Sequence, residues 1–122
     1  MAQENVNGYK SAEPDFLRGM RRILGDRVKF VLDIKQSVRA GHTPYEVAGA
    51  MGDGIIHVHA NDHRPGQDCL LPGQGEMDYP KLQRMLQSFG YQGRWMIEVY
   101  RKNFQCSSQL REAAGYLHTV LH

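Results

Sequence analysis

Helical and strand-like hydrophobic patterns alternate along this chain, and this alternation limits its fold more than any other feature. Apolar residues recur with helical spacing in four segments: residues 14–24, 43–52, 78–90 and 107–121. Short apolar runs typical of strands lie between them: residues 28–34, 54–59 and 94–100, with a further strand expected near residues 3–6. Strands that alternate with helices imply parallel βαβ units with right-handed crossovers, so we predict an α/β fold.

Local signals mark where these helices begin. Thr43 can cap the second helix, Pro44 suits its first position, and Glu46 completes a capping box. Asp78 can cap the third helix in the same way. Between them, residues 60–77 form a long polar stretch rich in Gly and Pro, which we interpret as a functional loop.

Composition and length exclude several classes of protein. The 122 residues fit one domain, and a net charge of +2 excludes nucleic-acid binding driven by bulk charge. The apolar runs are far shorter than the roughly 20 residues of a membrane span, and the N-terminal segment has no secretory pattern. Cys69 and Cys106 cannot form a disulfide framework, so we expect a cytoplasmic protein with reduced thiols.

Polar side chains stand at the ends of the predicted strands. These are Glu4, Asp33, His59 and Glu98. Taken singly, each also fits a loop-capping or hydrogen-bonding role. Because the carboxyl ends of parallel strands face one common mouth, we expect the four to converge there. Carboxylates with an imidazole suit a divalent ion such as Mn²⁺, Mg²⁺, Co²⁺ or Zn²⁺. His57 lies on the same strand face, but His59 is nearer the strand end.

Several short motifs resemble the xylose isomerase-like TIM barrels, which include sugar and sugar-phosphate isomerases and epimerases and the related endonuclease IV. The matching pieces, in order, are LD (32–33), RAGHTP (39–44), MGDGIIHVHAND (51–62), LPGQGEMDY (71–79), GYQG (90–93) and MIEVY (96–100). Residues 2–6, AQENV, resemble the end of the family's fifth strand, where members carry a metal-binding Glu. The resemblance implies that residues 1–122 form a single domain, the C-terminal half of a (β/α)₈ barrel with three or four strands.

The resemblance also assigns roles. Glu4, Asp33, His59 and Glu98 match the metal ligands of the family's ketose epimerases, whose two glutamates also act as acid and base. Such a site supports proton transfer through a metal-bound enediolate. Three further positions match substrate-binding residues: Gln36, Asp62 and Arg64.

Two departures from the family pattern affect the activity. Gln36 stands where many relatives have a His, so it can donate a hydrogen bond but cannot take up a proton. Asp68-Cys69 stands where endonuclease IV has a DxH pair. These differences argue against phosphodiester cleavage.

Half of a barrel exposes two sheet edges and an apolar inner face, which is costly in water. We therefore expect the chain to pair with itself as a homodimer through these edges; a fragment of a longer protein and an open, flattened sheet are the alternatives. The expected function is that of a metal-dependent isomerase or epimerase acting on a sugar or sugar phosphate. The alternatives are a truncated or inactive half-barrel that binds metal and acts by association, and a related polyol-ketone dehydratase.

Overall fold

The computed structural model describes residues 2–121, so Met1 and His122, the ends of the expected domain, lie outside it. Its strands are β1 (Ala2–Glu4), β2 (Lys29–Asp33), β3 (Ile55–Ala60), β4 (Asp62–Arg64), β5 (Gln67–Leu70) and β6 (Arg94–Ile97). Its α-helices are α1 (Pro14–Leu24), α2 (Ile34–Arg39), α3 (Pro44–Met51), α4 (Tyr79–Ser88) and α5 (Ser107–Val120). Single 3₁₀ turns are η1 (Lys10–Ala12), η2 (Gly25–Arg27), η3 (Gly52–Gly54) and η4 (Arg101–Asn103). No helix among residues 2–121 has the length and apolar character needed to cross a membrane.

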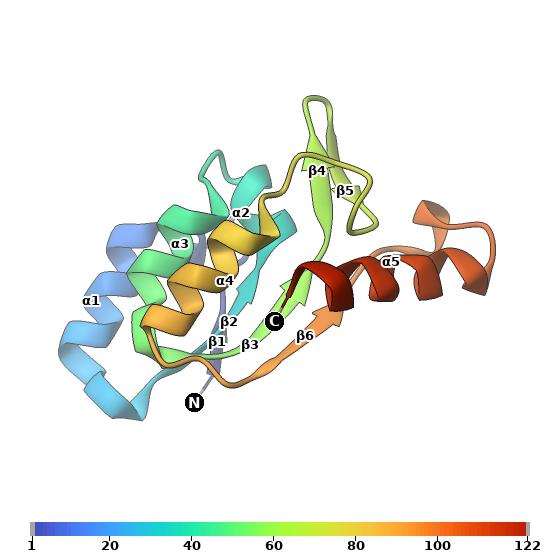
Figure 1. The fold of residues 1–122 in the computed structure, drawn as a ribbon. Coiled ribbons are helices and arrows are strands. Elements are labelled where there is room, and N and C mark those ends of the chain that lie inside the picture. Colours follow the sequence, from blue (N-terminus) through green and yellow to red (C-terminus); the bar gives the residue numbers. More distant parts are fainter. Residues whose placement is uncertain (1, 122) are drawn as a thin grey trace.

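Four strands form one parallel sheet in the order β1-β2-β3-β6 (Figure 1). The connections between successive strands carry helices, as expected for βα repeats. The predicted α/β class with parallel βα repeats is therefore confirmed, and the four strands are half the number in a complete TIM barrel.

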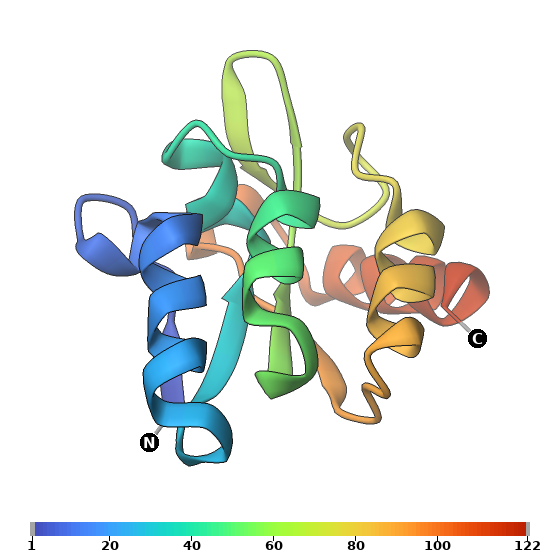
Figure 2. The same cartoon turned by 90° about the vertical axis from the view of Figure 1, so that its left-hand side faces the viewer.

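The helices bury one face of this sheet. Figure 2 shows α1, α3 and α4 side by side in front of the strands. Phe30 and Leu32 of β2 are completely buried on this face, as are Leu17 of α1, Val47 of α3 and Leu82 of α4. Each such side chain contributes about 1.5–3 kcal/mol of hydrophobic stabilisation.

The other face of the sheet is more open. Residues paired in register on parallel strands point to the same side of the sheet. The pairs on the open side are Glu4 with Val31, Val31 with His57, and Asp33 with His59. Val31 and His57 are half-buried, and Met96 beside His59 is 54% exposed. The polar strand-end residues thus lie on the side that α1, α3 and α4 do not cover.

The predicted helix starts are confirmed. The Thr43 hydroxyl accepts the Glu46 backbone N–H at 3.0 Å, and the Glu46 side chain accepts the Thr43 N–H at 3.3 Å. Asp78 caps α4 by accepting the Lys81 N–H at 3.0 Å.

Several element boundaries differ from the prediction, and β1 ends at Glu4 rather than near Val6. Strand β2 ends at Asp33, because α2 begins directly at Ile34 with Asp33 as its N-cap. The predicted loop 60–77 contains the β4–β5 hairpin, whose two-residue turn Pro65-Gly66 uses a positive φ of 80° at the glycine. Strand β6 ends at Ile97, three residues earlier than predicted.

Candidate functional site

The sheet brings the four strand-end residues together. Asp33 and His59 are paired in register at the ends of β2 and β3. Glu4 is the last residue of β1, and Glu98 follows β6, with its backbone N–H donating to the Ala60 carbonyl at 3.0 Å. Glu98 is two residues beyond Met96 and so lies on the same face of the sheet.

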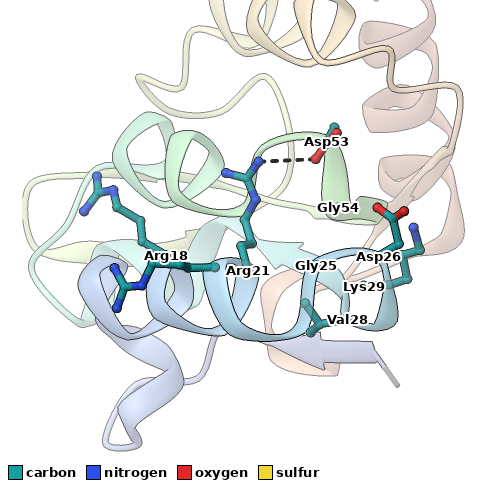
Figure 3. A pocket seen from close by; sticks show the side chains of 9 residues that line it. Arg18, Arg21, Gly25, Asp26, Val28, Lys29, Asp53 and Gly54 are labelled. Carbon is teal, nitrogen blue, oxygen red and sulfur yellow. Dashed lines mark hydrogen bonds and ion pairs between the residues drawn. The ribbon is translucent and has the colours of Figure 1, made fainter.

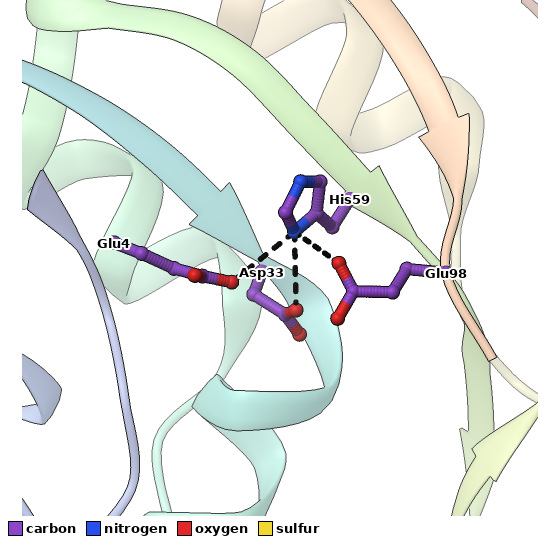
Figure 4. A group of neighbouring side chains, drawn as sticks. All are labelled: Glu4, Asp33, His59 and Glu98. Atoms are coloured by element: carbon purple, nitrogen blue, oxygen red, sulfur yellow. Dashed lines mark hydrogen bonds and ion pairs between the residues drawn. The ribbon is translucent and has the colours of Figure 1, made fainter. Parts of the chain in front are cut away.

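One ligand atom from each of these four side chains lies within 4.8 Å of the others. Figure 4 shows the His59 ring nitrogen facing all three carboxylates. His59 Nδ1 is 3.1 Å from Glu4 Oε1 and 3.5 Å from Asp33 Oδ2, and it also contacts Glu98 Oε2. The four side chains therefore lie close together, as expected from their positions at the strand ends.

The donor set fits a divalent cation. A single imidazole nitrogen carries at most one proton, so it cannot satisfy three carboxylates. Asp33 is completely buried, and its Oδ2 has no hydrogen-bond donor among the described residues. A buried carboxylate oxygen without a donor is costly unless a cation neutralises it. Three carboxylates and one imidazole form an oxygen-rich set that suits Mn²⁺, Mg²⁺, Co²⁺ or Zn²⁺.

The electrostatic surroundings of Glu4 also favour a bound cation. Burial raises the pKa of the Glu4 carboxyl, and the negative charges of Asp33 and Glu98 raise it further, whereas His59 lowers it. Crowding of like charges is thus a cost that a bound cation would relieve.

Asn5 holds Asp33 in place, a role that the sequence did not suggest. Asn5 is completely buried, accepts the Asp33 backbone N–H at 2.8 Å and donates to the Asp33 carbonyl at 3.0 Å. It also donates to the Ser37 hydroxyl at 3.1 Å. The only sequence feature that could have indicated this role is the position of Asn5 directly after Glu4.

Asn61 has a similar role toward Glu98. Its side-chain amide donates to the Glu98 carbonyl at 3.3 Å, while the buried Tyr79 hydroxyl donates to the Asn61 carbonyl. Two asparagines thus anchor the backbone of two candidate ligands.

The predicted substrate-binding residues have different surroundings. Gln36 lies in the first turn of α2 beside the cluster, and its Oε1 accepts the Asn7 N–H at 2.9 Å. Its amide nitrogen donates to no group among residues 2–121 and so is available to a ligand. Arg64 is exposed at the tip of the β4–β5 hairpin, where its guanidinium donates to the Gln67 side chain.

Asp62 organises the loop that follows the hairpin. Its carboxylate is completely buried and accepts backbone N–H groups of His63 (2.8 Å), Gly73 (2.9 Å) and Met77 (2.9 Å). The structure therefore shows a loop-shaping role for Asp62, and its contact with a substrate stays a prediction.

A separate cavity of about 440 Å³ lies at the opposite ends of the strands, where β2 and β3 begin (Figure 3). Arginines of α1 dominate its lining, but two of them are engaged with carboxylates. Arg18 pairs with Asp15 at 2.8 Å, and Arg21 pairs with Asp53 at 3.3 Å. None of the predicted site residues lines this cavity.

Solved structures with this fold include three named for sugar epimerases. A D-tagatose 3-epimerase-like protein is 25% identical, with a TM-score of 0.63, and the match covers 96% of this chain and 46% of that one. The 3-keto-D-glucoside 4-epimerase of E. coli has a TM-score of 0.73 at 21% identity, with 95% and 44% covered. D-psicose 3-epimerase of Clostridium cellulolyticum, solved with D-tagatose, has a TM-score of 0.73 at 18% identity, with 98% and 47% covered.

Sequence relatives and a family pattern agree with this likeness. An uncharacterized protein of Mycobacterium tuberculosis is 30% identical over 103 residues, which are 80% of this chain and 37% of that protein. One of Mycobacterium leprae is 24% identical over 105 residues, covering 81% and 38%. The chain thus spans less than half the length of the relatives it matches. The sequence pattern of the xylose isomerase-like TIM barrel matches residues 1–120, so this chain belongs to that family.

Proposed function

We propose that this chain is a sugar isomerase- or epimerase-type domain that depends on a divalent metal ion. The observation that carries the proposal is the convergence of three carboxylates and an imidazole, with a buried Asp33 oxygen that lacks a donor. The epimerases among the structural neighbours support the same class of reaction.

In this proposal the two glutamates move the proton. Glu4 ends one edge strand, Glu98 follows the other, and they approach the cluster from opposite sides, so a sugar carbon between them would have one carboxylate on each face. One carboxylate removes the proton next to the carbonyl and leaves an enediolate, and the other, in its protonated form, donates its own proton to the opposite face, so the configuration inverts.

The cluster would also hold the metal ion, and Gln36 would orient the substrate. Glu4, Asp33, His59 and Glu98 would hold the ion, which when bound supplies Lewis-acid stabilisation of negative charge on the substrate oxygens. The free amide nitrogen of Gln36 donates a hydrogen bond to a substrate hydroxyl or carbonyl. The half-buried cluster excludes part of the bulk water, which strengthens these interactions.

The proposed substrate is a small ketose, free or phosphorylated, in the cytoplasm. The neighbours are named for epimerisation of D-tagatose, D-psicose and a 3-keto-glucoside. The free thiols of Cys69 and Cys106 agree with a reducing compartment.

Hydrogen exchange tests the function directly. The protein, loaded with Mn²⁺ in D₂O, is incubated with a panel of ketoses and ketose phosphates. We expect deuterium to enter next to the carbonyl, and Glu98→Gln to reduce its rate at least about 100-fold. Absence of exchange from a folded, Mn²⁺-loaded sample would contradict the proposed reaction, and an elimination product would indicate a dehydratase instead.

We also propose that two copies associate through their sheet edges. Strands β1 and β6 are the edges of the sheet, and Met96 beside β3 is 54% exposed on the open face. Pairing would cover both features. Sedimentation at several protein concentrations tests this: a dimer is expected, and Met96→Lys weakens it. An inactive monomer that binds Mn²⁺ would favour the alternative of a metal-binding domain without activity.

A further inference from the structure

Lys35 is a buried cation beside the carboxylate cluster. It lies on α2, two residues after Asp33, and its side chain is only 2% exposed. Its ammonium is 3.5 Å from Glu98 Oε1 and 4.6 Å from the centroid of the Tyr100 ring. A lysine at this depth is uncommon unless its charge is paired.

The contacts of Lys35 divide the two oxygens of Glu98 between different partners. Oε1 faces the Lys35 ammonium, whereas Oε2 contacts His59 Nδ1 inside the cluster. With one oxygen occupied in this way, Glu98 presents a single oxygen to the ligand set.

Lys35 also changes the charge of the site. The cluster contains three carboxylates and one imidazole, which is neutral when it binds a metal. The ammonium offsets one negative charge, and the two that remain match a divalent ion. The ammonium is buried and lies 3.5 Å from Glu98 Oε1, which is the pairing that a buried charge requires.

We propose that Lys35 is a positioning residue that holds Glu98 as a one-oxygen ligand and sets the site's preference for divalent over trivalent ions. This inference rests on the proposed function, because it assigns Lys35 a role toward the same ion. Lys35 was not predicted as a site residue, because a lysine on a helix is normally solvated.

Calorimetric titration of the whole chain with Mn²⁺ and with La³⁺ tests the proposal. In Lys35→Met the site would carry one more uncompensated negative charge, which attracts a trivalent ion more than a divalent one. We expect the affinity ratio of La³⁺ to Mn²⁺ to rise at least about tenfold. A purely structural role would weaken both ions and leave their ratio unchanged.

Two control variants keep a positive charge at position 35. Lys102 is exposed, and its ammonium lies 5.8 Å from the same Tyr100 ring, so Lys102→Met is the matched control and should keep the wild-type ratio. Lys35→Arg retains the charge and should also keep it. If Lys35→Met does not fold, Lys35→Met is combined with Glu98→Gln so that the pair is removed together, and the ratio in this double variant should be higher than in Glu98→Gln alone.

The outcomes separate the two proposals. If the wild-type protein binds no Mn²⁺, the proposed metal-dependent function fails. The role of Lys35 is overturned, while the function stands, if the wild type binds Mn²⁺ but the La³⁺-to-Mn²⁺ affinity ratio does not change in Lys35→Met. For the double variant, the corresponding result is a ratio equal to that of Glu98→Gln alone.

Discussion

Asp33 Oδ2 lies 3.5 Å from His59 Nδ1, at the ends of two strands paired in register, and receives no hydrogen bond from the described residues. The Asp33 backbone is fixed on both sides by Asn5. The side-chain Oδ1 of Asp33 accepts the Gln36 N–H at 3.0 Å, so the carboxylate cannot turn toward water without breaking this bond. In the absence of a cation, this arrangement costs folding free energy.

Replacing Asp33 by Asn should reduce the stabilisation that metal gives to the protein. Asn keeps the oxygen that accepts the Gln36 N–H at 3.0 Å and removes one buried negative charge. Without metal, we expect Asp33→Asn to unfold at the same temperature as the wild type or higher. At a Mn²⁺ concentration of about 100 times Kd, the wild type should gain about 2.7 kcal/mol and the variant less than about 1 kcal/mol. Thermal melts with EDTA or MnCl₂ measure both quantities.

The control for this experiment is Glu112→Gln, which removes an exposed carboxylate on α5. It should respond to Mn²⁺ like the wild type. An equal response of Asp33→Asn and Glu112→Gln would show that Mn²⁺ acts elsewhere on the protein.

The raised pKa of Glu4 predicts how pH affects the metal-free protein. Because burial and neighbouring carboxylates raise this pKa above its ordinary value of 4.5, the folded state binds a proton more readily than the unfolded state. The resulting stabilisation is present below pH 4.5 and is lost as the pH rises through the raised pKa. Urea denaturation in EDTA at a series of pH values should show this loss in the wild type and a smaller loss in Glu4→Gln. Equal pH dependence of the two proteins would exclude Glu4 as the source.

Asp62 is expected to matter for stability more than any exposed carboxylate. In Asp62→Ala, backbone N–H groups of His63, Gly73 and Met77 lose their shared acceptor. We expect a loss of about 3 kcal/mol in the free energy of unfolding. Asp53→Ala removes only an exposed partner of Arg21 and should cost less than about 1 kcal/mol. Chemical denaturation of both variants makes the comparison, and similar losses would contradict the role of Asp62.

Two glycines should respond oppositely to alanine. A Cβ at Gly75 would lie 2.3 Å from the His63 carbonyl oxygen and 2.5 Å from Asp62 Oδ1, so Gly75→Ala must displace the backbone of this loop. We expect a loss of at least about 2 kcal/mol. A Cβ at Gly49 in α3 meets nothing within 4 Å, and Gly49→Ala should stabilise the helix by about 0.5–1 kcal/mol. Thermal melts of the two variants test the contrast; a neutral Gly75→Ala would show that the loop yields easily.

Much of the fold followed from regular patterns in the sequence. The capping box at Thr43 and the apolar stripe of residues 14–24 depend on neighbours within one or two helical turns, and both appear in the structure. The convergence of strand-end side chains followed from parallel topology alone, since it needs no knowledge of side-chain packing.

Other features depend on contacts distant in sequence and could not be predicted in this way. Helix α2 has only six residues and begins without a break after β2, so its pattern is too short to be recognised. The buried positions of Asn5 and Lys35 depend on groups 28 and 63 residues away, Asp33 and Glu98 respectively. The Pro65-Gly66 turn was a local signal of the hairpin, and the surrounding polar residues concealed it.

The shortness of β1 has a consequence for how an ion would come and go. Glu4 is supplied by an edge strand of three residues, whereas Asp33 is held in the sheet interior. Edge segments fray far more often than central strands, so β1 can detach while the rest of the sheet persists. We therefore expect the rate of ion exchange to follow local opening of the N-terminal segment, with protection of the Glu4 amide against hydrogen exchange rising when Mn²⁺ is present.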